Sequence, residues 1–259
     1  MNDTRDDHGH NHDHYTDRQA AELYETLNPW SRSDAFFLAF VMGAGHALDI
    51  GCGTGRLLHR ARAAGHAGEL VGIDPDPGML AVAVAAATPD DRITWRRASA
   101  ADITDRARFD VAIMASHGFQ YLASDAVLDR SLDAIARSLR QGGRFVFDTR
   151  NPLAREWETW TPEHAFAVVD PAGRALRMVY QVEDVCGDLV TFTESTCDRD
   201  GTPLRVDRAT FRFLSVEALN AHLHAAGFVV EAQYGGFDEA PFAPDSPEIV
   251  TVAVVRRDW

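Results

Sequence analysis

The stretch ALDIGCGTG at residues 47–55 decides the fold of this chain. It begins as a predicted buried strand, turns at Gly51, Gly53 and Gly55, and leads into a predicted helix at residues 56–64. A strand, a glycine-rich turn and a helix open a βαβ unit that binds phosphates or nucleosides. Glycines let a ligand approach the main chain because no Cβ stands in the way. The helix N-terminus then presents unpaired N–H groups to that ligand.

Acidic residues flank this turn. Its spacing is G-x-G-x-G, which differs from the dinucleotide pattern G-x-G-x-x-G. Asp49 stands just before the turn, and Cys52 lies inside it. Asp74 ends the next apolar run, residues 70–73, where an acidic side chain can accept both hydroxyls of a ribose. We therefore expect Asp49, Cys52, Asp74 and the three glycines to bind a nucleoside.

At this point the chain resembles the class I S-adenosylmethionine-dependent methyltransferases. The resemblance covers roughly residues 15–259 and rests on LDIGCGTG (48–55), GIDPDPGML (72–80), ASAADI (98–103), FDVAIMASHGFQYL (109–122) and LRQGGRFVFDTRNP (139–152). It implies an α/β fold with a doubly wound, Rossmann-like sheet of seven strands in the order 3-2-1-4-5-7-6. It also implies S-adenosylmethionine as the cofactor and methyl transfer as the activity.

The resemblance suggests further cofactor contacts. Met79 matches a residue that packs on the adenine ring, and Asp102 matches one that accepts the adenine amino group. A core methionine and a helix cap are the alternatives for these two residues. Tyr15, Tyr24 and Trp30 lie in or beside N-terminal helices of the kind that close over the cofactor and the substrate in the family, with Tyr15 expected at the cofactor and Trp30 at the substrate. An aromatic face attracts the cationic sulfonium, so Tyr24 is a catalytic candidate; packing of these helices on the core is the alternative.

The segment after the fourth predicted strand is expected to line the methyl-transfer site, because ligands bind beyond the carboxyl ends of the strands. His117 is the candidate general base since it titrates near neutral pH. Tyr121 and Asp148 are the weaker candidates for this role. The other side chains expected here are Ser116 beside the cofactor, and Phe119 and Arg150 beside the acceptor. Methyl transfer depends mainly on positioning, which can supply about 7–11 kcal/mol, and a base is optional.

The chain divides into three parts. Residues 1–14 are a predicted disordered tail with alternate histidines, and no metal site is expected there or elsewhere. Residues 15–151 and 215–259 form the predicted methyltransferase domain. Residues 152–214 are predicted antiparallel strands that form a lid over the acceptor. Trp157 and Trp160 either form a wall for the acceptor or pack the lid on the domain.

Two details of this division can be checked directly. Glu194, on a lid strand, could neutralise a cationic amine, but the solvent face is the favoured prediction for it. The helix that Ser124 caps is expected to continue through Leu139 and to end at Gly142 and Gly143.

Composition limits the function. The chain has 25 Lys and Arg against 39 Asp and Glu, a net charge of −14, which argues against nucleic-acid substrates and favours a small, neutral or cationic acceptor. No apolar run approaches the roughly 20 residues that span a bilayer. The acidic, histidine-rich start is not a secretory signal, and the three cysteines form no paired framework. We therefore expect a cytoplasmic protein without a membrane partner.

Several alternatives stay open. A nucleic-acid methyltransferase that acts on amino groups carries Asn/Asp-Pro-Pro-aromatic after strand four, where this chain has Ser116-His117-Gly118-Phe119. A nicotinamide oxidoreductase needs the missing G-x-G-x-x-G. A peptide methyltransferase and a non-catalytic module that binds the cofactor are further possibilities. The acceptor atom (N, O or C) and the choice between monomer and homodimer are also open.

Overall fold

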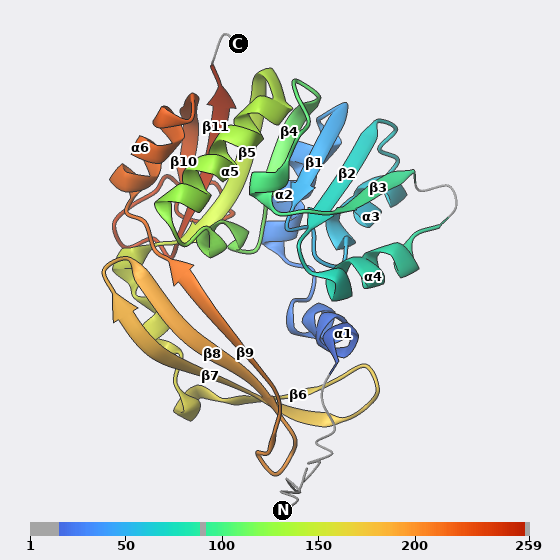
Figure 1. The fold of residues 1–259 in the computed structure, drawn as a ribbon, viewed down its shortest axis with the longest axis vertical. Helices are drawn as coiled ribbons and strands as arrows, with labels where there is room; N and C mark the ends of the chain where they lie inside the picture. Colours follow the sequence, from blue (N-terminus) through green and yellow to red (C-terminus); the bar gives the residue numbers. More distant parts are fainter. Residues whose placement is uncertain (1–15, 89–91, 257–259) are drawn as a thin grey trace, which may run out of the picture.

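The computed structural model describes residues 16–88 and 92–256 and contains two sheets (Figure 1). The first half of the chain forms α1 (Asp17–Leu27), α2 (Arg32–Met42), β1 (His46–Ile50), α3 (Arg56–Ala63), β2 (Glu69–Asp74), α4 (Pro77–Ala86), β3 (Ile93–Arg97), β4 (Phe109–Met114), α5 (Asp125–Ser138) and β5 (Leu139–Arg150). The second half forms β6 (Phe166–Val169), β7 (Ala175–Cys186), β8 (Leu189–Cys197), β9 (Pro203–Arg212), α6 (Val216–Ala225), β10 (Phe228–Tyr234) and β11 (Glu248–Val255). Short 3₁₀ turns include η1 (Ala100–Asp102), η2 (Gly118–Tyr121) and η4 (Glu156–Thr159).

The larger sheet has seven strands in the order β3-β2-β1-β4-β5-β11-β10. β1 to β5 run parallel, and β11 pairs antiparallel with both β5 and β10. This is the predicted order 3-2-1-4-5-7-6, so the predicted fold class is confirmed. Helices cover both faces, because alternate strand residues point to opposite sides: Leu48 packs with α5 and α6, and Ala47 with α2 and α3.

The smaller sheet is antiparallel, with the order β6-β7-β8-β9, and lies below the carboxyl ends of the parallel strands in Figure 1. α1 lies between the two sheets. Its Leu23 is buried against Leu176 and Met178 of β7. On the other side, Asp17 of α1 packs against Gly78 of α4. α1 therefore contacts both layers at once.

The predicted end of one helix is wrong. α5 begins after the Ser124 cap as expected, but it ends at Ser138. Leu139 is already extended and pairs with Phe109, so Gly142 lies inside β5. The pairing resumes at Val111 and Arg144, and the extra residues form an irregularity in which Gly142 has a φ of +78°. The glycine thus permits a bulge here rather than ending a helix. Within residues 16–88 and 92–256, no helix has the length and apolarity needed to cross a bilayer.

Replacing Gly55 by alanine should destabilise the fold strongly. Gly55 has a φ of +75°, and an added Cβ would meet the Trp95 ring. Gly51 has a similar φ of +70° but open space around the Cβ position, so Gly51→Ala isolates the backbone strain. We expect a loss of about 3 kcal/mol for Gly55→Ala and about 1 kcal/mol for Gly51→Ala in urea unfolding. Equal losses would contradict the packing argument.

Candidate active site

The glycine turn after β1 forms the floor of the site. Gly51, Gly53 and Gly55 all adopt positive φ angles, of +70°, +53° and +75°. The backbone N–H groups of Gly51 and Cys52 donate to the carbonyl oxygen of Ile73, at 2.8 and 3.0 Å. These two bonds tie the turn to the end of β2. A Cβ at Gly51 would meet nothing within 4 Å, so the turn presents open main chain to a ligand.

Asp74 joins the loops that follow β1 and β2. Its carboxylate accepts the Gly53 N–H at 2.8 Å through Oδ2 and the Asp76 N–H at 2.8 Å through Oδ1. Asp76 in turn caps α4 by accepting from the N–H groups of Gly78 and Met79. A carboxylate offers about four lone pairs, so Asp74 keeps capacity for two hydroxyl donors. Burial raises the pKa of Asp74.

Asp49 is a second buried carboxyl group beneath the turn. Burial, together with the neighbouring Asp74 carboxylate, raises the pKa of Asp49 to about 7. Burial also raises the pKa of the Cys52 thiol. A cationic ligand above the turn would favour the ionised form of Asp49.

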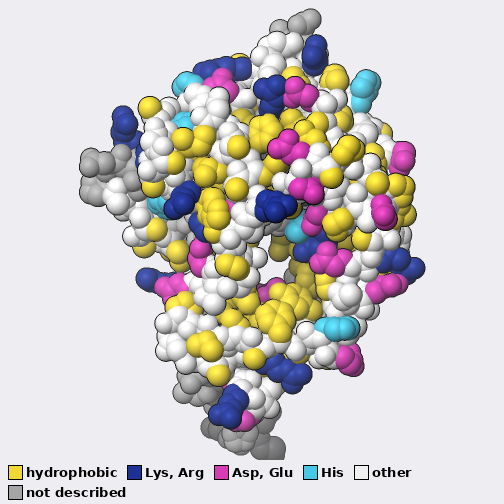
Figure 2. All heavy atoms as spheres, turned by 180° about the vertical axis from the view of Figure 1, so that it is seen from behind, with side chains coloured by type: hydrophobic (Ala, Val, Ile, Leu, Met, Phe, Trp, Pro, Cys, Tyr) yellow, Lys and Arg dark blue, Asp and Glu magenta, His cyan; other side chains and the backbone are white. Residues whose placement is uncertain are grey.

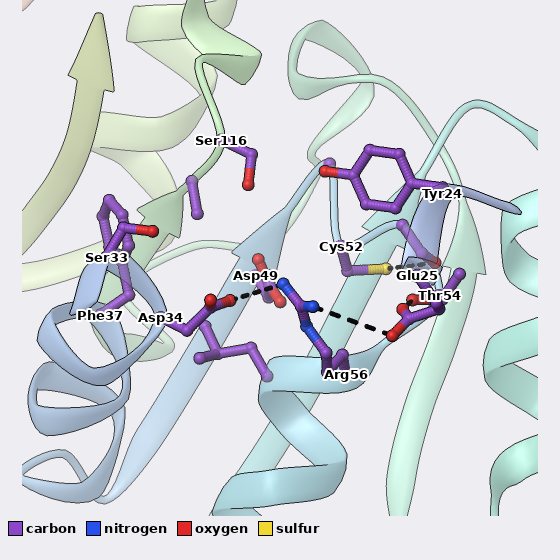
Figure 3. A pocket seen from close by; sticks show the side chains of 14 residues that line it. Tyr24, Glu25, Ser33, Asp34, Phe37, Asp49, Cys52, Thr54, Arg56 and Ser116 are labelled. Carbon is purple, nitrogen blue, oxygen red and sulfur yellow. Dashed lines mark hydrogen bonds and ion pairs between the residues drawn. The ribbon is translucent and has the colours of Figure 1, made fainter. Parts of the chain in front are cut away.

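A narrow groove lies over the turn, and we call it the turn groove (Figure 3). It is lined by Tyr24, Glu25, Ser33, Asp34, Phe37, Asp49, Gly51, Cys52, Gly53, Thr54, Arg56, Leu57, Ala115 and Ser116. Three contacts close it from α1 and α2: Thr54 donates to Glu25, and Arg56 donates to the Asn28 carbonyl and, at 2.8 Å, to Asp34. Its open volume is only about 60 Å³, because these helices lie directly above the turn.

A larger cavity of about 680 Å³ lies between the two sheets, and we call it the lid cavity. Figure 2 shows the hollow between the two halves of the molecule, with hydrophobic side chains along one wall. Tyr24 and Ser116 line both the turn groove and the lid cavity. Figure 3 shows the Tyr24 hydroxyl directed toward Ser116, which follows the end of β4. The two spaces thus meet at this pair.

Aromatic and acidic side chains dominate the lid cavity. Its aromatic walls are Tyr24, Tyr121, Trp160, Phe166, Tyr180, Phe192, Phe211 and Phe237. Its charged groups are four carboxylates, Asp148, Glu156, Glu194 and Asp207, against one arginine, Arg150. Glu194 is paired in register with Tyr180 and Asp207 on the neighbouring strands, and Asp207 forms an ion pair with Arg205. Burial raises the pKa of Glu194.

His117 contacts two carboxylates at the edge of the lid cavity. Its Nε2 atom lies 3.0 Å from Glu248 Oε2 and 3.3 Å from Asp148 Oδ2. Its backbone N–H donates to Asp148 at 3.0 Å. Burial alone would lower the pKa of His117, but Asp148 and Glu248 outweigh it and raise this pKa. Burial raises the pKa of Asp148 to about 6.

Most predicted site residues lie at one of these two spaces. Asp49, Gly51, Cys52 and Gly53 line the turn groove, Tyr24 and Ser116 line both spaces, and His117, Tyr121, Arg150 and Trp160 line the lid cavity. Asp74 and Met79 flank the turn, since Met79 Sδ lies 4.0 Å from the Cβ position of Gly53. Gly55 instead packs on Trp95. Tyr15 and the histidine tail lie outside the described residues.

Two predictions for the acceptor wall do not fit the structure. Phe119 is buried and stacks on Phe147 with ring centroids 4.4 Å apart, so it belongs to the core. The ring centroids of Trp157 and Phe213 lie 4.5 Å apart. Trp157 thus joins the turn η4 to the end of the lid strand β9. Phe119 lies in the 3₁₀ turn η2 and Trp157 in η4, and neither residue lines the lid cavity.

Trp30 and Asp102 both make contacts within the protein, and their ligand contacts stay predictions. Trp30 lies on the outside of α3, where the guanidinium groups of Arg56 and Arg60 stack on its ring at 5.8 and 5.4 Å. Asp102 accepts from the Ser99 hydroxyl at 2.6 Å and from its N–H at 3.1 Å. This is the helix cap that was the alternative for Asp102.

The structure adds Tyr180, Asp207 and Glu248 to the site and corrects the favoured prediction for Glu194. Glu194 was expected on the solvent face, but it lines the lid cavity, together with Tyr180 and Asp207. Residues 192 and 194 on β8 and residues 207, 209 and 211 on β9 alternate along their strands, and they all line the lid cavity. This alternation was the sequence signal that could have placed Glu194 on the cavity face. Glu248 comes from the far end of the chain and joins β5 because Glu248 pairs with Arg150. No local pattern indicates that pairing.

Comparison with known proteins now identifies the class. Residues 47–143, from β1 into β5, match the family model described as a methyltransferase domain. No curated protein matches the sequence.

Solved structures share the fold at low identity. An S-adenosylmethionine-dependent methyltransferase from Clostridium acetobutylicum has a TM-score of 0.71 at 17% identity, covering 92% of this chain and 98% of that chain. The sugar N-methyltransferase KedS8 from Streptoalloteichus has a TM-score of 0.67 at 22% identity, covering 91% of each chain. CalS10, an amino pentose methyltransferase from Micromonospora echinaspora solved with S-adenosylmethionine bound, has a TM-score of 0.64 at 19% identity, covering 90% of this chain and 95% of that chain.

The chain therefore contains a methyltransferase domain, and its fold is that of the class I S-adenosylmethionine-dependent methyltransferases. The resemblance seen in the sequence is confirmed, and with it S-adenosylmethionine as the cofactor of the class. The residues of the turn fit this cofactor on structural grounds. The turn offers open main chain, and Asp74 has free acceptor capacity for the two hydroxyls of a ribose. The buried carboxyl group of Asp49 would stabilise the positive charge of the sulfonium.

The pKa of Asp49 predicts a pH-dependent affinity. Below pH 7 the carboxyl group is mostly neutral, and above pH 7 it is ionised and attracts the sulfonium. The dissociation constant for S-adenosylmethionine should fall up to about tenfold between pH 6 and pH 8. S-adenosylhomocysteine, which lacks the sulfonium charge, should show a smaller change. Calorimetry of Asp49→Asn should give flat profiles; an unchanged slope in that variant would refute the role of Asp49.

Proposed function

We propose that this protein methylates an amine nitrogen of a small polar molecule, such as an amino sugar, held in the lid cavity. The observation that carries the proposal is the meeting of the two spaces at Tyr24 and Ser116. A cofactor bound over the glycine turn would present its methyl group at this boundary. An acceptor in the lid cavity would approach the boundary from the opposite side, as in-line displacement requires.

The cofactor residues follow from the geometry of the turn. We assign the Asp74 carboxylate to bonds with the ribose hydroxyls. We assign the open main chain at Gly51 and Gly53 to contacts with one side of the nucleoside. S-adenosylmethionine supplies an activated methyl group on a positively charged sulfur. Tyr24 lies at the boundary where it can face that charge with its ring. Because the turn groove is narrow, α1 and α2 must move outward for the cofactor to enter.

The lid cavity favours a cationic acceptor. Four carboxylates face one arginine, and Arg150 already bonds Glu156 and Gln120 at 3.0 Å while stacking on Trp160 and Phe211. Arg150 thus neutralises part of its own surroundings, and Arg205 pairs with both carboxylate oxygens of Asp207. Glu194 is the carboxylate left to face the acceptor. Aromatic rings and carboxylates together stabilise an ammonium group. Two of the similar structures are described as a sugar N-methyltransferase and an amino pentose methyltransferase, which supports this acceptor class.

An ammonium must lose a proton before its nitrogen attacks. Glu194 suits this step because burial raises its pKa and because it faces the cavity from β8. The predicted bases His117 and Tyr121 suit it less. His117 Nε2 already bonds two carboxylates, and burial raises the pKa of Tyr121 to about 12. We therefore assign acceptor binding and proton acceptance to Glu194, and propose that residues 152–214 act as the lid that carries it.

A methyl-transfer assay tests the proposal with a panel of small amines, their N-acetylated forms and the matching alcohols. The amines should be methylated, and the acetylated forms should not, because acetylation removes the charge. Glu194→Gln should lower kcat/KM for the best amine at least tenfold, since it removes a charge-assisted hydrogen bond. Glu163→Gln, an exposed lid residue outside the cavity, is the matched control. Methylation of the alcohols alone, or a normal rate in Glu194→Gln, would contradict the amine assignment.

A further inference from the structure

His117, Asp148 and Glu248 form a cluster whose chemistry the proposed methyl transfer does not use. One nitrogen and two carboxylate oxygens lie within 4.8 Å of one another, one from each residue. They come from the end of β4, the end of β5 and the start of β11, three neighbouring strands of the sheet. The cluster lies at the carboxyl edge of β4 and β5, and two of its members, His117 and Asp148, line the lid cavity.

The separations suit a divalent cation. His117 Nε2 lies 3.0 Å from Glu248 Oε2 and 3.3 Å from Asp148 Oδ2. Bonds of about 2.1 Å to a metal, at right angles, place neighbouring donor atoms about 3.0 Å apart. A cation could therefore enter among these three groups with small side-chain shifts. A proton on His117 can also hold the same atoms together, so a second observation is needed.

The buried oxygen of Asp148 supplies that observation. Asp148 is 1% exposed, and its Oδ1 atom has no hydrogen-bond partner among the described residues. Its other oxygen accepts the His117 N–H at 3.0 Å, which fixes the orientation of the carboxylate. A buried carboxylate oxygen without a partner is costly unless a cation or a donor binds it. Arg150 is the nearby cation, but the bonds that the structure gives it go to Glu156 and Gln120.

We propose that His117, Asp148 and Glu248 bind one divalent metal ion at the edge of the lid cavity. One imidazole nitrogen and two carboxylates suit Mn²⁺ or Zn²⁺. Carboxylate oxygens are hard ligands of the kind that Mn²⁺ prefers, and the imidazole nitrogen is a common ligand of Zn²⁺. The side of the ion that faces the lid cavity is open to an oxygen of the acceptor. This departs from the expectation that the chain has no metal site. Cation binding itself does not depend on the proposed acceptor, so its test is independent of methyl transfer.

Binding of Mn²⁺ to the metal-stripped, full-length protein tests the proposal, by calorimetry and electron paramagnetic resonance. Wild type should bind one Mn²⁺ that Glu248→Gln binds at least tenfold more weakly. Glu194→Gln removes a carboxylate of the same cavity outside the cluster, and should bind Mn²⁺ as wild type does. The histidines of residues 1–14 are present in all three proteins, so any binding to them cancels in the comparison. Equal affinity in wild type and Glu248→Gln, or no binding in wild type, would overturn the proposal.

A second measurement covers the case in which Glu248→Gln does not fold. The electron spin echo of bound Mn²⁺ should show coupling to an imidazole nitrogen in wild type. The coupling should disappear in His117→Ala, because His117 supplies the only nitrogen of the proposed site. Persistence of the same coupling in His117→Ala would assign the ion to other histidines and would overturn the proposal.

Discussion

The carboxylate of Asp74 is the contact on which the rest of the site depends. It holds the Gly53 N–H with one oxygen and the Asp76 N–H with the other, both at 2.8 Å. The loops after β1 and β2 are thereby fixed relative to each other, and Asp76 can cap α4 in the same arrangement. Gly51 keeps open space around its Cβ position, whereas Gly55 packs on Trp95. A rigid floor for a nucleoside results from one buried carboxylate and a few backbone bonds.

α1 connects this floor to the lid. Glu25 and Asn28, at the end of α1, contact Thr54 and Arg56 at the turn, while Leu23 is buried against β7 of the lid sheet. A movement of α1 that admits the cofactor would therefore also shift the lid sheet. This coupling is a physical reason for the acceptor cavity to form fully only when the cofactor is bound, because both spaces share Tyr24 on the same helix.

The sheet could be predicted from sequence because its signals are local. The glycine turn, the cap at Ser124 and the apolar strands each lie within about ten residues. The acceptor side could not be predicted to the same extent. Glu248 reaches His117 only through the antiparallel pairing of β11 with β5, and Glu194 faces the cavity only because of the register of β8. Phe119 was misplaced because a 3₁₀ turn, which has no strong sequence signal, sets its direction. Long-range register, rather than motif, determines this half of the site.

A crystal structure of the protein with S-adenosylhomocysteine tests the central claim most directly. The account predicts that both ribose hydroxyls bond the Asp74 carboxylate and that the sulfur lies beside Tyr24 and Ser116, facing the lid cavity. It also predicts that α1 has moved away from Thr54 and Arg56. A nucleoside bound at any other place, or a turn groove still closed by Glu25 and Asn28 with the ligand bound, would contradict the account.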